Sequence, residues 1–312
     1  MNTIGIIAIV ISSLIFLIVL SYFFIGEISY SISLKRSSVA GKFIGKDMER
    51  KWIKRLKIDL SWWETNLTER VEISSKPKLV GRIRINNPKK FVILVHGYMA
   101  DYKSMQTYAK AFQDFGFSFL CTENRAHGES EGKSAGMGWL DKNDLKKWIK
   151  YLIKTYGEDI EIVLFGVSMG GATVCMTSGL ELPENVKCII SDCAYDNVLN
   201  QFEHVAKSYM KIPPKIALKI LDSYAEIRAG YRLQDADAVK QVKKTKVPIL
   251  FIHGTKDSFV PCYMVENLYN ATPENLREKY IVEGAEHSEC HAKDFDKYNK
   301  VVENFINKYL DN

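Results

Sequence analysis

The sequence of 312 residues is poor in proline and cysteine, with 8 and 6 residues of these types. None of the cysteines stands in a Cys-x-x-Cys pair or begins a Cys-x-x-His spacing. A chain of this length, with 46% apolar residues, can build a core without disulfide bonds. These properties argue against a disulfide scaffold, a structural zinc module and a disordered chain. We expect the cysteines to behave as small buried apolar residues.

The sequence also lacks the short motifs that bind common cofactors. It has no Gly-x-x-x-x-Gly-Lys-Ser/Thr phosphate loop, no dinucleotide-binding Gly-x-Gly-x-x-Gly and no zinc-binding His-Glu-x-x-His. Kinase, dehydrogenase and zinc-protease functions therefore lose their support, and we expect neither a cofactor nor a metal ion. No fixed-period repeat is present, which argues against a solenoid.

Charge is unevenly distributed along the chain. Of 43 basic and 37 acidic residues, nine basic and four acidic ones lie in the first 60 residues, which leaves 34 and 33 in the remainder. A nucleic-acid enzyme normally spreads basic residues over its binding face, so we expect no nucleic-acid partner. A basic cluster beside an apolar segment is typical of contact with lipid headgroups.

The apolar segment is Ile4–Ile25, which contains 22 residues and no charge. As a helix it would be about 33 Å long, enough to cross a hydrocarbon layer of about 30 Å. A cleaved signal peptide, the alternative, normally starts with basic residues and ends at a small-x-small site. No Lys or Arg precedes this segment, and Gly-Glu-Ile-Ser-Tyr follows it. We therefore predict a retained transmembrane anchor over residues 1–26, in contact with membrane lipid.

Residues 27–60 are predicted to be a basic juxtamembrane connector. Because positive charge next to a membrane span favours the cytoplasmic side, the remainder of the chain is expected in the cytoplasm. Unpaired cysteines agree with a reducing compartment. The predicted protein is single-pass, and the opposite orientation stays open.

Strand-like and helix-like segments alternate over residues 61–312. The predicted strands are Val71–Ser74 and Leu79–Ile85, as an opening hairpin, and then Phe91–Val95, Phe117–Thr122, Ile160–Val167, Val186–Asp192, Val247–His253 and Lys279–Val282. The predicted helices are Ser104–Phe115, Asp141–Tyr156, one beginning at Met169, and Phe295–Leu310. This alternation predicts an α/β fold with a doubly wound, mostly parallel sheet. Residues 195–245, with helical segments only, are predicted to form a helical cap over one edge of the sheet.

The most specific motif is Gly166-Val167-Ser168-Met169-Gly170, between a predicted buried strand and a predicted helix. A nucleophilic serine on a tight turn stands clear of the sheet, and glycines on both sides relieve the crowding that the turn creates. The following helix directs N–H groups and its positive dipole end at the site. We predict that Ser168 is a nucleophile.

A nucleophilic serine requires a base, and the sequence offers six histidines. His287 follows the last predicted strand, where the chain order Ser, Asp, His places the base. His291 lies four residues further on and is the alternative. His96 and His253 each end a strand as His-Gly, which favours turn-forming or oxyanion-loop roles. His127 comes before the serine in the chain, and His204 lies in the predicted cap.

The imidazole in turn requires a carboxylate, which fixes its tautomer and stabilises its charged form. Asp257, in the loop after the penultimate strand, is the first candidate. Asp192, at the end of the preceding strand, is the alternative. For the oxyanion hole, which requires two N–H donors, we predict the backbone of Met169 and of Tyr98 in the loop after the Phe91–Val95 strand.

Taken in order, these motifs resemble the α/β-hydrolase superfamily. They are His-Gly-x after the first central strand, Arg-x-His-Gly-x-Ser, Gly-x-Ser-x-Gly-Gly, His-Gly-x-x-Asp-x-x-Val-Pro and Gly-Ala-x-His. Within it, residues 69–310 are similar to bacterial serine aminopeptidase-like and acyl-esterase-like hydrolases, some with an amino-terminal anchor. The resemblance implies an α/β-hydrolase fold with Ser168 as nucleophile, Asp257 as acid, His287 as base, and Tyr98 and Met169 as oxyanion donors.

One segment departs from the family pattern. Many relatives have Asp-x-Arg-Gly-His-Gly where this chain has Glu-Asn-Arg-Ala-His-Gly, residues 123–128. This segment usually shapes a loop, so the departure casts little doubt on catalysis.

We expect a serine hydrolase that forms an acyl-enzyme on Ser168 and cleaves a carboxylic ester or related acyl bond in a small molecule. A peptidase acting on peptide or aminoacyl amides is the alternative. A non-catalytic protein on the same fold is less favoured, because the complete set of three residues would then have no use. Aromatic and apolar residues of the predicted cap suit an acyl chain or pack the cap onto the sheet; they are Phe202, Tyr209, Met210, Ile212 and Tyr224.

Overall fold

The computed structural model describes residues 3–36, 38, 61–66, 68–210 and 214–310. Most of the predicted connector, residues 39–60, therefore lies outside the described residues. The same is true of Ile212 and of the side chains of Tyr209 and Met210.

An eight-stranded sheet forms the centre of the described chain, in the order β1-β2-β4-β3-β5-β6-β7-β8. β1 and β2 pair antiparallel with each other, β2 pairs antiparallel with β4, and all later pairs are parallel. The strands are β1 (Glu69–Ile73), β2 (Leu79–Arg84), β3 (Lys90–Val95), β4 (Ser118–Thr122), β5 (Glu161–Val167), β6 (Val186–Asp192), β7 (Ile249–Gly254) and β8 (Arg277–Val282). The predicted mostly parallel sheet is confirmed.

The central strands are buried on both faces, and their side chains alternate between two cores. Along β3, Phe91, Ile93 and Val95 belong to one core, whereas Val92 and Leu94 belong to the other. This explains why the central strands are continuously apolar in sequence.

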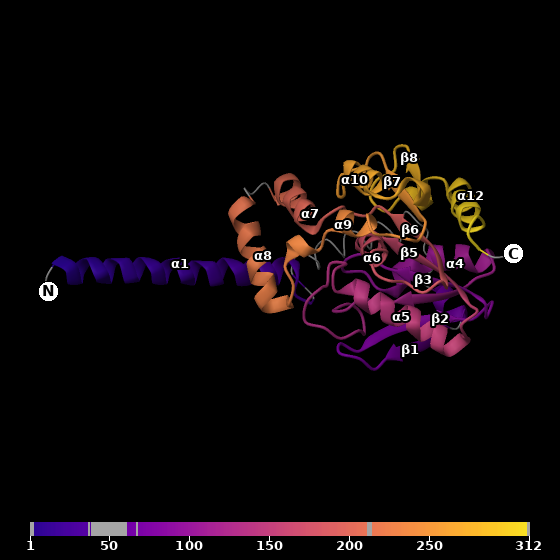
Figure 1. Cartoon of the computed structure of the whole chain (residues 1–312), viewed down its shortest axis with the longest axis horizontal. Coiled ribbons are helices and arrows are strands. Elements are labelled where there is room, and N and C mark those ends of the chain that lie inside the picture. The colour runs from indigo at the N-terminus through magenta and orange to yellow at the C-terminus, as the bar shows by residue number, and fades with distance from the viewer. Residues whose placement is uncertain (1–2, 37, 39–60, 67, 211–213, 311–312) are drawn as a thin grey trace.

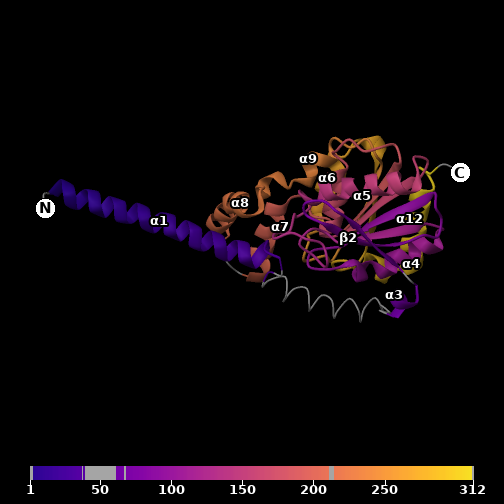
Figure 2. The ribbon, with the colours of Figure 1, turned by 90° about the horizontal axis from the view of Figure 1, so that it is seen from below.

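Helices cover the two faces. The first core is closed by α5 (Asp141–Tyr156), α6 (Met169–Thr177), α9 (Ala238–Val242) and α10 (Tyr263–Ala271), and the second by α4 (Gln106–Asp114) and α12 (Phe295–Ile306). Figure 2 shows α5 and α6 on one side of the sheet and α4 on the other. The short elements are α3 (Ser61–Thr65), η1 (Tyr102–Met105), η4 (Glu274–Leu276) and α11 (Cys290–Lys293). The sequence prediction did not include α10.

Between β6 and β7 the described chain forms helices without a strand. They are α7 (Val198–Val205), the π-helical segment η2 (Ala206–Met210), α8 (Lys215–Ala229), the 3₁₀ segment η3 (Leu233–Asp235) and α9. In Figure 1, α7 and α8 lie at the end of the molecule from which α1 projects.

The amino-terminal helix α1 (Thr3–Ser33) has 31 residues and extends away from the rest of the protein (Figure 1). Among the described helices it is long and apolar enough to cross a membrane. It does not end with the apolar run at Ile25: residues 27–33, which the sequence analysis assigned to the connector, are helical. The physical reason is tertiary packing, because α8 lies across these last turns and buries Gly26 and Tyr30.

Candidate active site

Ser168 lies on the tight turn between β5 and α6, with φ 57° and ψ −117°. Positive φ is uncommon for a residue other than glycine and indicates local strain, which is frequent at functional sites. Glycine is required on both sides of Ser168, at 166 and 170, because backbone atoms of neighbouring segments lie too close for a side chain. A Cβ on Gly170 would lie 2.0 Å from the carbonyl oxygen of Val95, and one on Gly166 would lie 2.1 Å from that of Gly170.

His287 follows β8, and its imidazole lies between the other two candidate residues. Its Nε2 is 2.9 Å from Oγ of Ser168, and its Nδ1 is 2.7 Å from Oδ2 of Asp257. A carboxylate can only accept, so Nδ1 carries the proton and Nε2 is left to accept from the serine hydroxyl. This is the tautomer that a general base requires.

Asp257 lies in the loop after β7 and is almost fully buried. Its Oδ1 accepts from the backbone N–H groups of Phe259 (3.0 Å) and Val260 (2.7 Å), which hold the carboxylate in place. Burial alone would raise the pKa of Asp257, but the imidazoles of His287 and His253 outweigh it and hold the pKa below its usual value. The group is therefore a carboxylate at neutral pH.

Asp192, the alternative acid, has a different environment. Its Oδ2 accepts a hydrogen bond of 2.8 Å from the hydroxyl of Tyr298 on α12. Burial raises the pKa of Asp192 to about 6. Its backbone carbonyl accepts from the N–H of Ser168 (2.8 Å), so this residue helps to hold the serine turn through its main chain.

The alternative base, His291, lies away from the serine turn. It is buried among the rings of Tyr108, Phe295 and Tyr298, and its Nε2 is 3.0 Å from Oδ1 of Asn299. Burial lowers its pKa to about 4, which keeps the imidazole neutral.

His253, expected to form a turn, also contacts the candidate acid. Its Nε2 is 2.8 Å from the carbonyl oxygen of Val260 and 3.3 Å from Oδ2 of Asp257. Sequence reasoning missed this contact, because the His-Gly pair that ends β7 indicates a turn and carries no signal for a partner four residues later. His204 on α7 contacts the same loop, with Nε2 2.7 Å from the carbonyl oxygen of Ser258.

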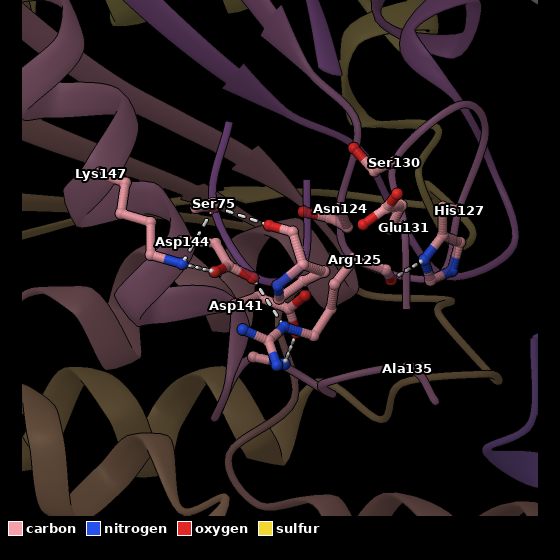
Figure 3. A network of polar contacts seen from close by, with 12 residues as sticks. Ser75, Asn124, Arg125, His127, Ser130, Glu131, Ala135, Asp141, Asp144 and Lys147 are labelled. Atoms are coloured by element: carbon pink, nitrogen blue, oxygen red, sulfur yellow. Dashed lines mark hydrogen bonds and ion pairs between the residues drawn. The ribbon is translucent and has the colours of Figure 1, made fainter. Parts of the chain in front are cut away.

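The segment that departs from the family pattern is held by polar contacts of its own (Figure 3). Arg125 donates to Asp144 on α5 (2.6 Å), and Lys147 reaches the same carboxylate (3.0 Å). The ring of His127 contacts the carbonyl oxygen of Arg125 (2.9 Å), and burial lowers the pKa of His127 to about 3. These contacts shape the loop after β4.

Tyr98 and Met169, the expected oxyanion donors, both line the space beside Ser168. The loop of Tyr98 passes close to the serine, since a Cβ added to Gly97 would lie 3.4 Å from Cβ of Ser168. Met169 is the first residue of α6, and the first N–H groups of a helix have no partner within it. Met137, which lines the same space, also has a positive φ, 47°.

A cavity of about 300 Å³ opens from Ser168 and is predominantly apolar. Its walls come from the Tyr98 loop, α7, Ala206, the first half of α8 with Pro214 before it and, unexpectedly, the last turns of α1. Of the cap residues suggested from the sequence, Phe202 lines this cavity, whereas Tyr224 packs against Gly26 of α1. No local pattern could have indicated the contribution of α1, because it depends on a contact between segments about 190 residues apart.

One group of side chains at the site has the donor types of a metal centre. Ligand atoms of Cys193, Asp257 and His287 lie within 4.8 Å of one another. Burial raises the pKa of the Cys193 thiol, which disfavours the thiolate that a metal requires, and its Sγ is 3.3 Å from Oγ of Ser288. Asp257 and His287 would also have to give up their mutual hydrogen bond, so the three residues fit a metal ion poorly.

Comparison with known proteins agrees with this geometry. Residues 86–227 match the family model described as serine aminopeptidase, S33. The chain is 28% identical over 220 residues to the uncharacterized protein YqkD of Bacillus subtilis, covering 70% of this chain and 72% of the relative. It is 24% identical over 221 residues to a monoacylglycerol lipase of Mycolicibacterium smegmatis, covering 58% of this chain and 78% of that protein.

Among solved structures, the chain is similar to the Pyrococcus furiosus esterase Pf2001, with a TM-score of 0.66 and 22% identity. The likeness covers 79% of this chain and 94% of that one. An alignment of this extent shows the same fold. In this chain the serine turn lies at the carboxyl end of β5, which pairs parallel with β3 and β6. The chain has the α/β-hydrolase fold, and its residues 86–227 are similar to the serine aminopeptidase family.

Proposed function

We propose that the protein is a serine hydrolase that cleaves carboxylic esters, with Ser168 as nucleophile, His287 as general base and Asp257 as the orienting acid. The observation that carries this proposal is the continuous series of hydrogen bonds from Ser168 Oγ to His287 Nε2 (2.9 Å) and from His287 Nδ1 to Asp257 (2.7 Å).

In the proposed reaction, His287 Nε2 takes the proton of Ser168 as Oγ attacks the carbonyl carbon of the ester. The N–H groups of Tyr98 and Met169 stabilise the oxyanion that forms. Collapse of this intermediate breaks the bond to the alcohol oxygen, which takes the proton from His287. Water then attacks the acyl carbon while His287 takes one of its protons. The bond between this carbon and Ser168 Oγ breaks, Oγ takes the proton from His287, and the carboxylic acid is released.

The lining of the cavity favours an ester with an acyl chain over a peptide. An aminopeptidase must pair the α-ammonium group of its substrate with a carboxylate. The described residues that line the cavity include no Asp or Glu, and most are apolar, such as Phe202, Leu218 and Leu221. The amide hydrolase stays the second candidate, because the family model matched here is that of a serine aminopeptidase.

We further propose that α1 anchors the protein in a membrane as a single span. The long exposed apolar surface of residues 4–24 supports this, and the basic residues between 35 and 57 favour a cytoplasmic location for the rest of the chain. In this arrangement residues 61–312 form the hydrolase domain, with residues 195–245 as its cap.

The nucleophile is tested with the full-length protein in detergent and a fluorophosphonate probe. The native chain should be labelled, and Ser168→Ala should lose both labelling and ester hydrolysis while keeping its thermal unfolding midpoint. Ser104→Ala, outside the cavity, is the matched control and should behave as the native chain does. Labelling of the Ser168→Ala protein at another serine would overturn the assignment.

Substrate preference is tested with p-nitrophenyl esters of graded chain length and with aminoacyl p-nitroanilides. We expect esters to be hydrolysed with the higher kcat/KM. Faster turnover of the anilides would favour the peptidase instead.

Location is tested by fractionation. Full-length protein should stay in the membrane after a carbonate wash, and protease added to intact cells without their wall should leave the hydrolase domain uncut. Release of a shorter soluble form would indicate a signal peptide.

A further inference from the structure

We infer that α1 is a substrate-binding element as well as an anchor: its last two turns form a wall of the acyl cavity, and a single-chain ester dissolved in the bilayer enters beside this helix. The inference rests on the proposed esterase function of Ser168.

Four residues near the end of α1 line the cavity together with Ser168. They are Ile28, Ser29, Ile32 and Ser33. Their spacing, with pairs four residues apart, places them on one face of the helix. The side of α1 that faces the cavity is therefore continuous over about two turns and presents isoleucine side chains to the ligand.

This wall is firmly held by the rest of the protein. Gly26 lies so close to Tyr224 on α8 that an added Cβ would be 2.6 Å from its ring. The hydroxyl of Tyr224 donates to Glu27 (2.8 Å), and that of Tyr30 lies 2.6 Å from Oγ of Ser134. Contacts on both sides of the helix end fix its position relative to the serine.

The end of α1 also supports the loop of the proposed oxyanion donor. The hydroxyl of Tyr98 donates to the carbonyl oxygen of Ser33 (2.5 Å), and Oγ of Ser38 lies 2.9 Å from the same hydroxyl. Burial raises the pKa of Tyr98 to about 12, so the hydroxyl keeps the proton that it donates. The helix that is proposed to enter the membrane is thus bonded directly to the catalytic loop.

The position of the cavity relative to the span indicates how a substrate would enter. Ile28 lines the cavity and is also 43% exposed, so the cavity reaches the surface beside α1. Ile28 lies three residues after Ile25, where the apolar run ends. This is a rise of about 4.5 Å along the helix. On α8, Ile216 is 74% exposed between Lys215 and the cavity-lining Ala217. The cavity therefore opens at the depth where the apolar span ends, among exposed apolar side chains.

The size of the cavity limits what it can hold. Its volume of about 300 Å³ lies at the lower end of the range for small-molecule sites, about 300–1,000 Å³. A small ester with one acyl chain is therefore the substrate class that we propose.

The role of α1 as a cavity wall is tested in the full-length protein by making the side chain at Ile32 larger and, separately, smaller. Ile32→Trp fills the cavity, and the ratio of kcat/KM for p-nitrophenyl decanoate to that for the acetate should fall by about tenfold or more. Ile32→Ala enlarges the cavity and should move the preferred chain length upwards. Misfolding would lower activity on all esters together, so opposite shifts require contact between Ile32 and the chain.

The matched control is the same pair of substitutions at Ile18, which is 68% exposed in the apolar part of α1. Both should leave the chain-length profile as it is in the native protein. Equal profiles for the Ile32 and Ile18 variants would overturn the role of α1 in binding.

The route of entry is tested in phosphatidylcholine vesicles that contain 1-monodecanoylglycerol. Ile28→Lys places a charge where the cavity meets the surface, and hydrolysis of the vesicle-dissolved ester should fall several-fold relative to that of p-nitrophenyl acetate in water. Ile227→Lys, at an exposed isoleucine on α8 outside the cavity, is the control and should leave this ratio unchanged. An unchanged ratio for Ile28→Lys would mean entry from water and would overturn this part of the inference.

These outcomes separate the inference from the function on which it rests. If the native chain neither reacts with the fluorophosphonate nor hydrolyses any ester, the proposed function fails and the inference with it. If the native chain hydrolyses esters and the Ile32 variants do not change selectivity, the inference alone fails.

Discussion

Asp192 is the last residue of β6 and Asp257 follows β7, the neighbouring parallel strand. Both are nearly inaccessible to solvent, with exposures of 0% and 5%. Their electrostatics are nevertheless opposite. Burial raises the pKa of Asp192 to about 6. At Asp257 the imidazoles of His287 and His253 outweigh the same penalty and hold the pKa below its usual value.

The difference teaches that place in the fold does not decide what a buried carboxylate does. Both loops leave the same edge of the sheet, so either carboxylate is a plausible third member of the triad. The partners decide: Asp257 contacts His287 (2.7 Å), whereas Asp192 contacts the neutral hydroxyl of Tyr298 (2.8 Å). A carboxylate with imidazole and N–H partners stays ionised, whereas burial dominates at Asp192, whose partners are the hydroxyl of Tyr298 and the thiol of Cys290.

The sharpest test of this comparison is Asp257→Asn. An amide in this position would present a donor or a weaker acceptor to His287 Nδ1 and favour the wrong tautomer, so kcat should fall by about 10⁴-fold. The measurement is kcat for p-nitrophenyl acetate, with the thermal unfolding midpoint as a check of the fold. A loss smaller than about tenfold would contradict the proposed role.

A second test uses the pH dependence of stability. Because the pKa of Asp192 is raised in the folded protein, the folded state binds its proton more tightly than the unfolded state does, and stability is lost as pH rises from about 4 to about 6. Over this range the native chain should lose up to about 3 kcal/mol relative to Asp192→Asn. This difference in the free energy of unfolding is measured by denaturant unfolding of both proteins at several pH values.

In that experiment the contribution of Asp257 has the opposite sign. Its pKa is lowered in the folded protein, so it stabilises the fold at pH values above the pKa of the unfolded chain, and this stabilisation is lost as pH falls. It is present in both proteins and cancels in the difference. Parallel stability curves for the two proteins would show that the pKa of Asp192 is not raised.

The contact that distinguishes Asp192 is tested by Tyr298→Phe. Removal of the hydroxyl leaves a buried carboxylate without this donor, and the free energy of unfolding should fall by about 1–3 kcal/mol. Tyr263→Phe, at an exposed tyrosine on α10, should change it by less than about 0.5 kcal/mol. Equal effects of the two substitutions would remove the energetic basis of the comparison.

The smallest expected effect is that of Asp192→Asn on activity. The amide oxygen of asparagine can still accept from Tyr298, and Ser168 bonds the backbone of this residue, so kcat should change by less than about tenfold. A greater loss here than in Asp257→Asn would assign the acid to the end of β6.

Much of the fold follows from local patterns. Continuous apolar runs indicated the central strands, and the amphipathic pattern of Asp141–Tyr156 indicated α5 with the observed bounds. The helix α10 was missed, because its nine residues follow a Pro-containing loop. The end of α1 was placed too early for another reason. Residues 27–33 contain polar side chains and so do not continue the apolar run, yet contacts with α8 keep them helical.

For the candidate site, the sequence by itself determined which residues could take part. Chain order and the glycines around Ser168 restricted the nucleophile to one turn, the base to two histidines and the acid to two aspartates, because strand ends of a parallel sheet meet at one edge. Chain order also ranked Asp257 above Asp192 and His287 above His291. The tertiary structure adds the hydrogen bonds that support this ranking, because they depend on distances of a few ångströms between distant segments. The same holds for the wall that α1 contributes to the cavity. Residues 28–33 carry no motif, and their place beside Ser168 is decided by packing against α8 and Tyr98, which no local pattern encodes.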